Sequence, residues 1–289
     1  MVIVSVVGGA GRMGSWCARF LKANGYTVIV TDKNLRAAGT FAKRYGLQFL
    51  SDQLAAVRRA RVVVVATPTN VTSAILQRIV PELKRGALVV EMSSIKAPVL
   101  RSIRSLRRNG VDVLSIHPMF GPGVRSIQGR CVLAVTVPKH REAHRLLSIF
   151  RKEGARIFYC TPEKQDSIAS VILALPHFMN VSFVETLRSL RVNLDEVNSV
   201  AGTTFQLQLL LAEEIYDEDY ENELSILRDC RMSVFKIFNH HTSTLLKMAA
   251  TRPERLTRVL RSGRRFVATE QHFSTSYERF NAAVEASLS

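Results

Sequence analysis

The chain has 289 residues, of which 47% are hydrophobic and 22% are charged. Such a composition is ordinary for a soluble globular protein, and the length allows two domains with a sizeable core. Lys and Arg number 40 against 24 Asp and Glu, so the formal net charge of +16 favours anionic ligands, from carboxylate metabolites to nucleic acid. The sequence contains no run of about eighteen apolar residues, so we expect no membrane span.

The basic residues gather in the segments 101–108 and 251–265. In the second segment, four arginines recur every three residues, close to one helix face: Arg252, Arg255, Arg258 and Arg261. Because helix surfaces normally carry such charges, we interpret this face as solvated, with a polyanion site as the alternative. The sequence has no RRM, zinc-finger or KH signature, so a nucleic-acid partner is not expected.

Cysteine usage and the N-terminus indicate the compartment. The four cysteines are far apart, with no CxxC pair and no zinc spacing. This pattern favours buried thiols in a reducing cytoplasm and predicts no metal site. The segment "MVIVSVVGGAG" lacks a basic region and a cleavage site, so it predicts a strand rather than a signal peptide.

Strand-like and helix-like patterns alternate over the first half of the chain. Short β-branched runs predict strands at Val2–Val7, Thr27–Thr31, Val62–Ala66, Ala87–Glu91, Asp112–Ile116, Cys131–Val137 and Arg156–Cys160. Amphipathic stretches predict helices around 12–24, 35–45, 71–80, 98–108 and 140–152. Fully apolar strands such as "VVVVA" are typical of a parallel sheet covered on both faces. The alternation predicts a doubly wound, mostly parallel α/β domain of the Rossmann type over residues 1–161.

The pattern changes at Pro162. From there helical periodicity prevails, and it continues around 199–216, 222–249 and 253–287. It predicts an all-helical domain over residues 162–289. The first helix of this domain is apolar on all sides, so we expect it to be buried, at a subunit interface.

A glycine-rich motif follows the first predicted strand. The segment Gly9-Ala10-Gly11-Arg12-Met13-Gly14 is a G-x-G-x-x-G that opens a helix. We expect Gly9 to permit the tight turn, Gly11 to let the backbone approach a pyrophosphate, and Gly14 to let helix and strand pack closely. The helix N-terminus then offers N–H groups and a positive dipole end to phosphates. The alternative is a tight strand–helix turn without a ligand.

Asp32 supports the dinucleotide interpretation. It lies 18 positions past the third glycine, at the end of the predicted strand "YTVIVTD". A carboxylate at this place can hold both ribose hydroxyls and repel a 2′-phosphate, which favours NAD. Lys33 and Arg36 follow closely and can accommodate a 2′-phosphate, so NADP is the alternative.

Two further strands end in polar segments. In a doubly wound sheet the carboxyl ends of the strands line the cofactor crevice. We therefore expect Thr67 and Pro68, in "VATPTNVT", near the nicotinamide-side ribose, with a plain loop as the alternative. In "EMSSIKAP", Ser94 can hydrogen-bond a substrate and Lys96 can attract a carboxylate. The alternative is that one of the two serines caps the following helix.

Two histidines are candidates for chemistry. His117, in "SIHPMFGPG", follows a predicted strand, so it points to the same crevice as the other strand ends. His177, in "LALPHF", lies within a helix that Pro176 should kink, since proline leaves the carbonyl of Ile172 without its donor. A satisfied core histidine is the alternative at each position. The sequence contains neither HExxH nor G-x-S-x-G, so metal and serine hydrolysis are unsupported.

The ordered set "VVGGAGRMG", "VATPTNVT", "MSSIK", "HPMFGP", "PEKQD" and "LALPHF" closely resembles the prephenate dehydrogenases, particularly the archaeal and bacterial branch with HPMFGP. The resemblance covers residues 1–190 motif by motif and the rest only in helical character. It implies NAD(P)-dependent oxidative decarboxylation of prephenate to 4-hydroxyphenylpyruvate in tyrosine biosynthesis, by a homodimer. It further implies that His117 binds the ring 4-hydroxyl and accepts its proton, with an imidazole pKa near the ordinary ~6.5. Ser94 would orient His117 or that hydroxyl, and His177 would line the substrate site.

The sequence departs from the family pattern at two places. Aligning "FQLQLLLAEE" with the family's arginine-bearing segment places Glu214 where an arginine should clamp a substrate carboxylate, and Gln165 stands where "PEKHD" has histidine. A carboxylate at short range would repel the prephenate dianion by several kcal/mol, about the size of a screened Coulomb interaction. Either another cation substitutes, or the substrate differs, or the alignment is shifted. The candidate cations are Arg125, Lys96, Arg228 and Arg231.

Two other functions stay open. One is a dehydrogenase of similar build acting on arogenate or another anionic hydroxy acid. The other is a non-catalytic NAD-binding regulator whose basic face binds nucleic acid or a protein.

Overall fold

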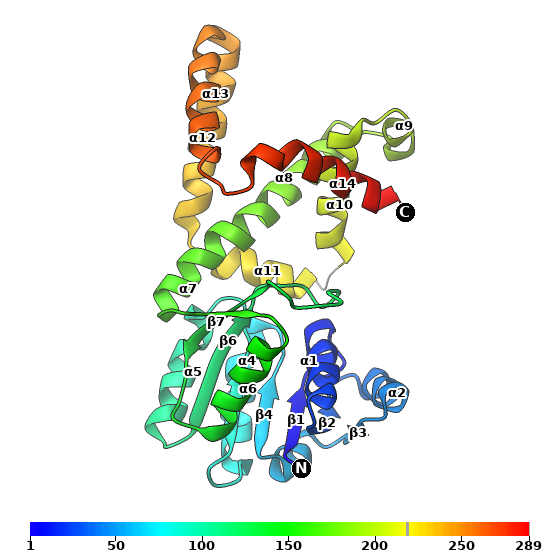
Figure 1. Ribbon diagram of the computed structural model, residues 1–289, viewed down its shortest axis with the longest axis vertical. Helices are drawn as coiled ribbons and strands as arrows, with labels where there is room; N and C mark the ends of the chain where they lie inside the picture. The colour runs from blue at the N-terminus through cyan, green and yellow to red at the C-terminus, as the bar shows by residue number, and fades with distance from the viewer. Residues whose placement is uncertain (218–219, 289) are drawn as a thin grey trace. The chain divides into compact units, whose positions relative to one another are not determined.

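The computed structural model describes residues 1–217 and 220–288. Its first unit, Met1–Ala169, is built on an eight-stranded sheet with the order β3-β2-β1-β4-β5-β6-β7-β8 (Figure 1). This order, and the parallel pairing of the first six strands, is that of a doubly wound nucleotide-binding sheet. The strands are β1 Ile3–Val7, β2 Thr27–Thr31, β3 Gln48–Phe49, β4 Val62–Val65, β5 Leu88–Glu91, β6 Asp112–Pro118, β7 Cys131–Thr136 and β8 Arg156–Tyr159.

Helices cover both faces of the sheet. One apolar cluster joins the sheet to α1, α2 and α6, and a second joins its other face to α3, α4 and α5. All four valines of β4 are buried, which explains the unbroken apolar run "VVVV". The helices of this unit are α1 Arg12–Ala23, α2 Leu35–Tyr45, α3 Gln53–Arg59, α4 Thr69–Ile79, α5 Ala97–Arg108, α6 Arg141–Lys152 and α7 Pro162–Ala169, with a 3₁₀ turn η1 at Val80–Glu82.

The predicted mostly parallel α/β sheet is confirmed, with three additions. β3 was not predicted, because a two-residue edge strand shows almost no period-2 alternation. The seven-residue helix α3 was not predicted either. β7 runs antiparallel to β6, and the register shifts between Ser115 and Ile116. This reversal leaves β6 as the last strand of the parallel set and places His117 opposite Leu133 of β7.

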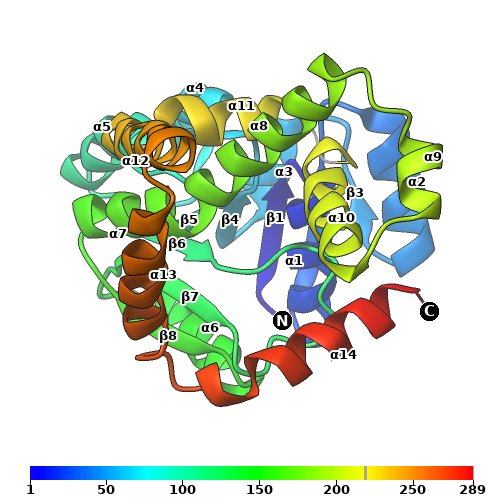
Figure 2. The same ribbon diagram turned by 90° about the horizontal axis from the view of Figure 1, so that it is seen from above.

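The second unit, Ser170–Ser289, is helical over its described residues. α12 contacts α13, and α10 contacts both α8 and α14 (Figure 2). The pattern expected to be one helix over 253–287 is instead divided into α13, a 3₁₀ turn and α14. The elements are a π-helical segment η2 Ser170–Ala174, α8 Leu175–Ser189, α9 Leu194–Ser199, α10 Thr203–Asp217, α11 Tyr220–Asp229, α12 Met232–Thr251, α13 Glu254–Val267, η3 Phe273–Thr275 and α14 Ser276–Leu288.

The two units meet at Ala169/Ser170, eight residues beyond the boundary expected at 161/162. α7 belongs to the first unit because Asp166 accepts hydrogen bonds from the backbone N–H groups of Lys96 and Ala97, at 2.6 and 2.8 Å. The π-helical turn at Ser170–Ala174 directly precedes α8, whose second residue is Pro176. A π turn is a common way for a helix to accommodate a missing N–H donor.

The first long helix is partly exposed in the single chain. Val171, Ile172 and Met179 are 52%, 55% and 44% exposed. The stretch Pro162–Ser189 is long and apolar enough to cross a membrane by length and composition alone, although a helix of a soluble protein can pass the same test. Coverage by a second copy of the chain stays a prediction.

Candidate functional site

The glycine-rich loop needs glycine at three positions, each for a different reason. Gly8 has φ +78°, so the left-handed residue of the turn is Gly8 and not Gly9 as expected. A Cβ on Gly9 would lie 2.5 Å from Val30 Cγ1 of β2. A Cβ on Gly14 would lie 2.0 Å from the Gly8 carbonyl oxygen, so helix and loop can approach this closely only when residue 14 is glycine.

The N-terminus of α1 can receive a phosphate. α1 begins at Arg12, its N-cap Gly11 makes no side-chain cap, and its first turn holds no acidic residue. Backbone N–H groups at such an end, together with the helix dipole, favour an anion. Arg12 is exposed, whereas Met13 is half-buried and packs against the core. The residues present therefore fit a bound dinucleotide.

Asp32 lies beside the glycine-rich loop. Its carboxylate accepts hydrogen bonds from the backbone N–H of Ala10 and of Asn34, each at 3.0 Å. An ionised carboxylate has about four acceptor positions, so two stay available for ribose hydroxyls. A neighbouring cavity of about 670 Å³ between α1 and α2 is lined by Ser15, Arg19, Asn34, Arg36, Ala37, Thr40, Phe41, Arg44 and Tyr45. Arg36 thus faces this cavity.

Thr67 and Pro68 take part in the turn between β4 and α4. The Thr67 and Thr72 hydroxyls lie 3.0 Å apart, and the Thr72 hydroxyl donates to the Pro68 carbonyl at 3.0 Å. Pro68 is also the N-cap of α4. These contacts match the plain-loop interpretation of the segment, and the proximity to a ribose stays a prediction.

His117 lies at the carboxyl end of β6 and is 5% exposed. Its Nδ1 lies 3.0 Å from Nε2 of the buried Gln165, which also donates to the Ser94 carbonyl oxygen at 2.7 Å. The structure therefore brings together the expected residues Ser94 and His117 through Gln165. In the sequence, Gln165 was identified only as a departure from the family motif "PEKHD". The contact between Gln165 and His117 was not predicted.

Lys96 does not have the position expected of a substrate-binding cation. Its ammonium group is fully buried, 2.9 Å from Glu91 Oε2 and 2.8 Å from the Ile116 carbonyl oxygen. The same Glu91 oxygen accepts a hydrogen bond from the Ser115 hydroxyl at 2.7 Å. A lysine in a buried ion pair cannot reach a substrate carboxylate, so Lys96 joins the ends of β5 and β6 instead. Glu91 and Ser115 were not predicted.

The electrostatics around His117 favour a neutral ring. Burial, together with the nearby charge of Lys96, lowers the pKa of His117 to about 3. The expectation of a pKa near ~6.5 is therefore wrong for this structure, because desolvation disfavours the imidazolium ion. Burial also lowers the pKa of Lys96, an effect that Glu91 opposes.

In the helical unit, His177 Nδ1 is hydrogen-bonded to Oε2 of Glu223, which is 6% exposed. Glu214 is exposed on α10. Of the candidate cations, Arg228 is paired with Asp229 at 2.7 Å, and the Arg231 backbone N–H donates to the Ser170 hydroxyl.

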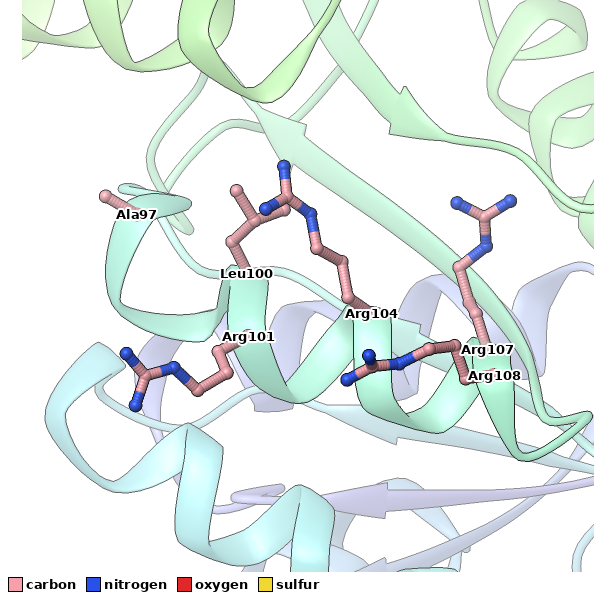
Figure 3. A pocket seen from close by; sticks show the side chains of 6 residues that line it. All are labelled: Ala97, Leu100, Arg101, Arg104, Arg107 and Arg108. Carbon is pink, nitrogen blue, oxygen red and sulfur yellow. The ribbon is translucent and has the colours of Figure 1, made fainter.

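Two basic features lie on the first unit. Arg125 is exposed in the loop after β6. α5 carries exposed arginines around a cavity of about 750 Å³, which Figure 3 shows lined by Ala97, Leu100, Arg101, Arg104, Arg107 and Arg108. Arg107 and Arg108 occupy the last turn of α5, where cations complement the helix dipole. The solvated face predicted for the second basic segment lies on α13, which has no buried residues.

The sheet order, the glycine-rich loop and Asp32 define the first unit as a dinucleotide-binding domain. A family model described as prephenate dehydrogenase, nucleotide-binding domain, matches residues 17–159. The chain belongs to the prephenate dehydrogenase family.

Three comparisons with individual proteins agree with this assignment. The chain is 30% identical over 219 residues to a probable arogenate/prephenate dehydrogenase of Methanocaldococcus jannaschii, covering 75% of this chain and 49% of the relative. It is 25% identical over 226 residues to the T-protein of Haemophilus influenzae, with 78% and 56% covered. The chain thus spans about half the length of these curated relatives. In fold it is similar to the crystal structure of prephenate dehydrogenase from Aquifex aeolicus, with TM-score 0.67, 19% identity, and 92% and 99% of the two chains covered.

Proposed function

We propose that this chain catalyses the NAD-dependent oxidative decarboxylation of prephenate to 4-hydroxyphenylpyruvate. The observation that carries the proposal is the buried His117 at the carboxyl end of β6, on the side of the sheet where the glycine-rich loop and Asp32 also follow the carboxyl ends of their strands. When bound, the nicotinamide cofactor accepts the hydride. Asp32 is proposed to hold its ribose hydroxyls, and the N-terminus of α1 its pyrophosphate.

His117 is proposed to hydrogen-bond the ring hydroxyl of the substrate, with Ser94 beside it. Its 5% exposure leaves the imidazole little access to bulk water, so the hydrogen bond forms in a low-dielectric environment where it is stronger. Arg125, exposed in the following loop, is proposed to attract a substrate carboxylate in place of the buried Lys96. His177 is proposed as a second substrate-binding residue, and the active protein as a cytoplasmic homodimer.

Arogenate is the second candidate substrate. It differs from prephenate in carrying an amino group on the side chain, and Glu214 supplies the observation in its favour. A carboxylate in a substrate-binding segment attracts an ammonium group and repels a keto acid dianion. Glu214 is exposed on α10, so its charge is available.

Absorbance at 340 nm with NAD and each substrate tests the proposal. Turnover of prephenate, with kcat at least 100-fold lower in His117→Asn, supports both the reaction and the residue, since a side chain that takes part in proton transfer contributes about 10²–10⁴-fold. Turnover of arogenate alone would favour the second candidate. Inactivity on both substrates would refute the proposal, and near-wild-type kcat in His117→Asn would refute the role of His117.

A further inference from the structure

A basic pocket lies next to the carboxylate that follows β2. It is the cavity of about 670 Å³ between α1 and α2, and Asn34 is one of its lining residues. The backbone N–H of Asn34 donates to Asp32 Oδ1 at 3.0 Å. The basic pocket therefore begins two residues past Asp32, where the adenosine ribose of the cofactor is proposed to bind.

Three arginines from two helices line the basic pocket. Arg19 comes from α1, whereas Arg36 and Arg44 come from α2, and all three are exposed. Arg36, Thr40 and Arg44 are spaced by four residues, so one face of α2 is turned to the pocket. The guanidinium carbons of Arg19 and Arg44 lie 5.4 and 5.5 Å from the centroid of the Tyr45 ring, which holds them together. Arg36 lies in the first turn of α2.

The charge around the basic pocket is strongly positive. None of its described lining residues is acidic. The only acidic residue in the segment 1–50 is Asp32, against seven cations: Arg12, Arg19, Lys22, Lys33, Arg36, Lys43 and Arg44. The N-terminus of α2, whose first turn contains no acidic residue, adds the positive end of a helix dipole. Because the planar guanidinium group matches the geometry of a phosphate, such a pocket suits a phosphate monoester.

We propose that the basic pocket binds the 2′-phosphate of NADP, with Arg36 as the residue that determines this specificity, so that the chain uses NADP as well as NAD. The inference rests on the proposed function for the dehydrogenase reaction and widens its cofactor. Arg36 is the lining arginine closest along the chain to Asp32, so it can meet a phosphate on the ribose that Asp32 is proposed to hold.

Asp32 does not by itself exclude a 2′-phosphate from this structure. Its Oδ2 accepts the backbone N–H of Ala10 and its Oδ1 that of Asn34, each at 3.0 Å, so both oxygens already face positive dipole ends. Arg36 adds a full positive charge beside them. The ribose of NADP keeps its 3′-hydroxyl, which can donate to the carboxylate as the ribose of NAD does. Asp32 and Arg36 together therefore admit both cofactors.

Calorimetric titration of the full chain with NAD and with NADP, at low ionic strength and without substrate, tests the inference. We expect the wild type to bind NADP with a Kd at most about tenfold above that for NAD. Arg36→Ala should raise the Kd for NADP by about tenfold or more and the Kd for NAD by less than about threefold, since a hydrogen bond to a charged group contributes about that factor. Added salt should weaken NADP binding more than NAD binding, because salt screens exposed charges.

Arg104→Ala is the matched control. Arg104, shown in Figure 3, is an exposed arginine of α5, which packs on the opposite face of the sheet from α1 and α2. The variant changes the net charge equally and should leave both Kd values within about twofold of the wild type.

A wild-type Kd for NADP more than about tenfold above that for NAD would overturn the inference without any variant. An unchanged ratio of the two Kd values in Arg36→Ala would overturn it as well. Because these titrations contain no substrate, inactivity on both prephenate and arogenate would refute the proposed reaction and leave the cofactor result standing.

Discussion

Burial of His117 should make the stability of the first unit depend on pH. The folded state holds this imidazole at a pKa of about 3, against 6.5 in an unfolded chain. Between these values the unfolded chain binds a proton that the folded chain does not. His117 therefore leaves stability intact above pH 6.5 and reduces it as pH falls. At pH 5.0, 1.5 units below 6.5, the loss is about 2 kcal/mol, since each unit corresponds to about 1.36 kcal/mol.

Urea unfolding at pH 7.5 and pH 5.0 measures this loss. Trp16, the single tryptophan, is 7% exposed and packs against Phe20, Phe120 and Phe150, so its fluorescence reports on the first unit. The wild type should lose about 2 kcal/mol more than His117→Asn over this pH change, because titration of all other groups cancels in the difference.

The exposed His144 on α6 supplies the matched control for this experiment. His144→Asn should retain the wild-type pH dependence, because its ring is in water in both states. Equal losses in the wild type and His117→Asn, within about 0.5 kcal/mol, would refute the reasoning, since additive changes agree to about that precision. That result would mean that the imidazole is hydrated in the folded protein.

Three further substitutions test the site and the fold. Gly14→Ala should abolish NAD binding measured by calorimetry, because its Cβ would lie 2.0 Å from the Gly8 carbonyl oxygen. Lys96→Met should lower the free energy of unfolding by about 3–5 kcal/mol in urea titrations, because it leaves the buried Glu91 charge unpaired. Gly263→Ala should raise that free energy by up to about 1 kcal/mol in the same assay, because Gly263 lies within α13 and an added Cβ meets no atom within 4 Å.

The strands could be predicted from the sequence where both of their faces are buried, because such strands consist almost entirely of apolar residues. β4, β5 and β6 are buried over nearly their whole length, so their apolar runs stand out. β3 has only two residues and lies at the sheet edge, where neither face demands an apolar side chain. The local sequence of β7 does not indicate that this strand runs antiparallel to β6, because parallel and antiparallel strands contain the same β-branched residues.

The candidate site was predictable in its positions and less so in its contacts. The strand-end rule located Ser94 and His117, which the structure connects through Gln165. It also suggested Lys96 as a ligand for substrate, and that was wrong because the acidic partner Glu91 lies on the preceding strand and withdraws the ammonium group from solvent. Such pairing depends on which side chains meet across neighbouring strands, which spacing along the chain does not specify.

The start of α5 depends on a residue some seventy positions further along the chain. α5 has no side-chain cap of its own, and Asp166 takes its place by accepting the N–H groups of Lys96 and Ala97. During synthesis, Asp166 can therefore cap α5 only after α7 has left the ribosome. A fragment that ends at residue 159, where the family match stops, lacks both Asp166 and Gln165. Such a fragment should fold into a less stable sheet than one that extends to Ala169.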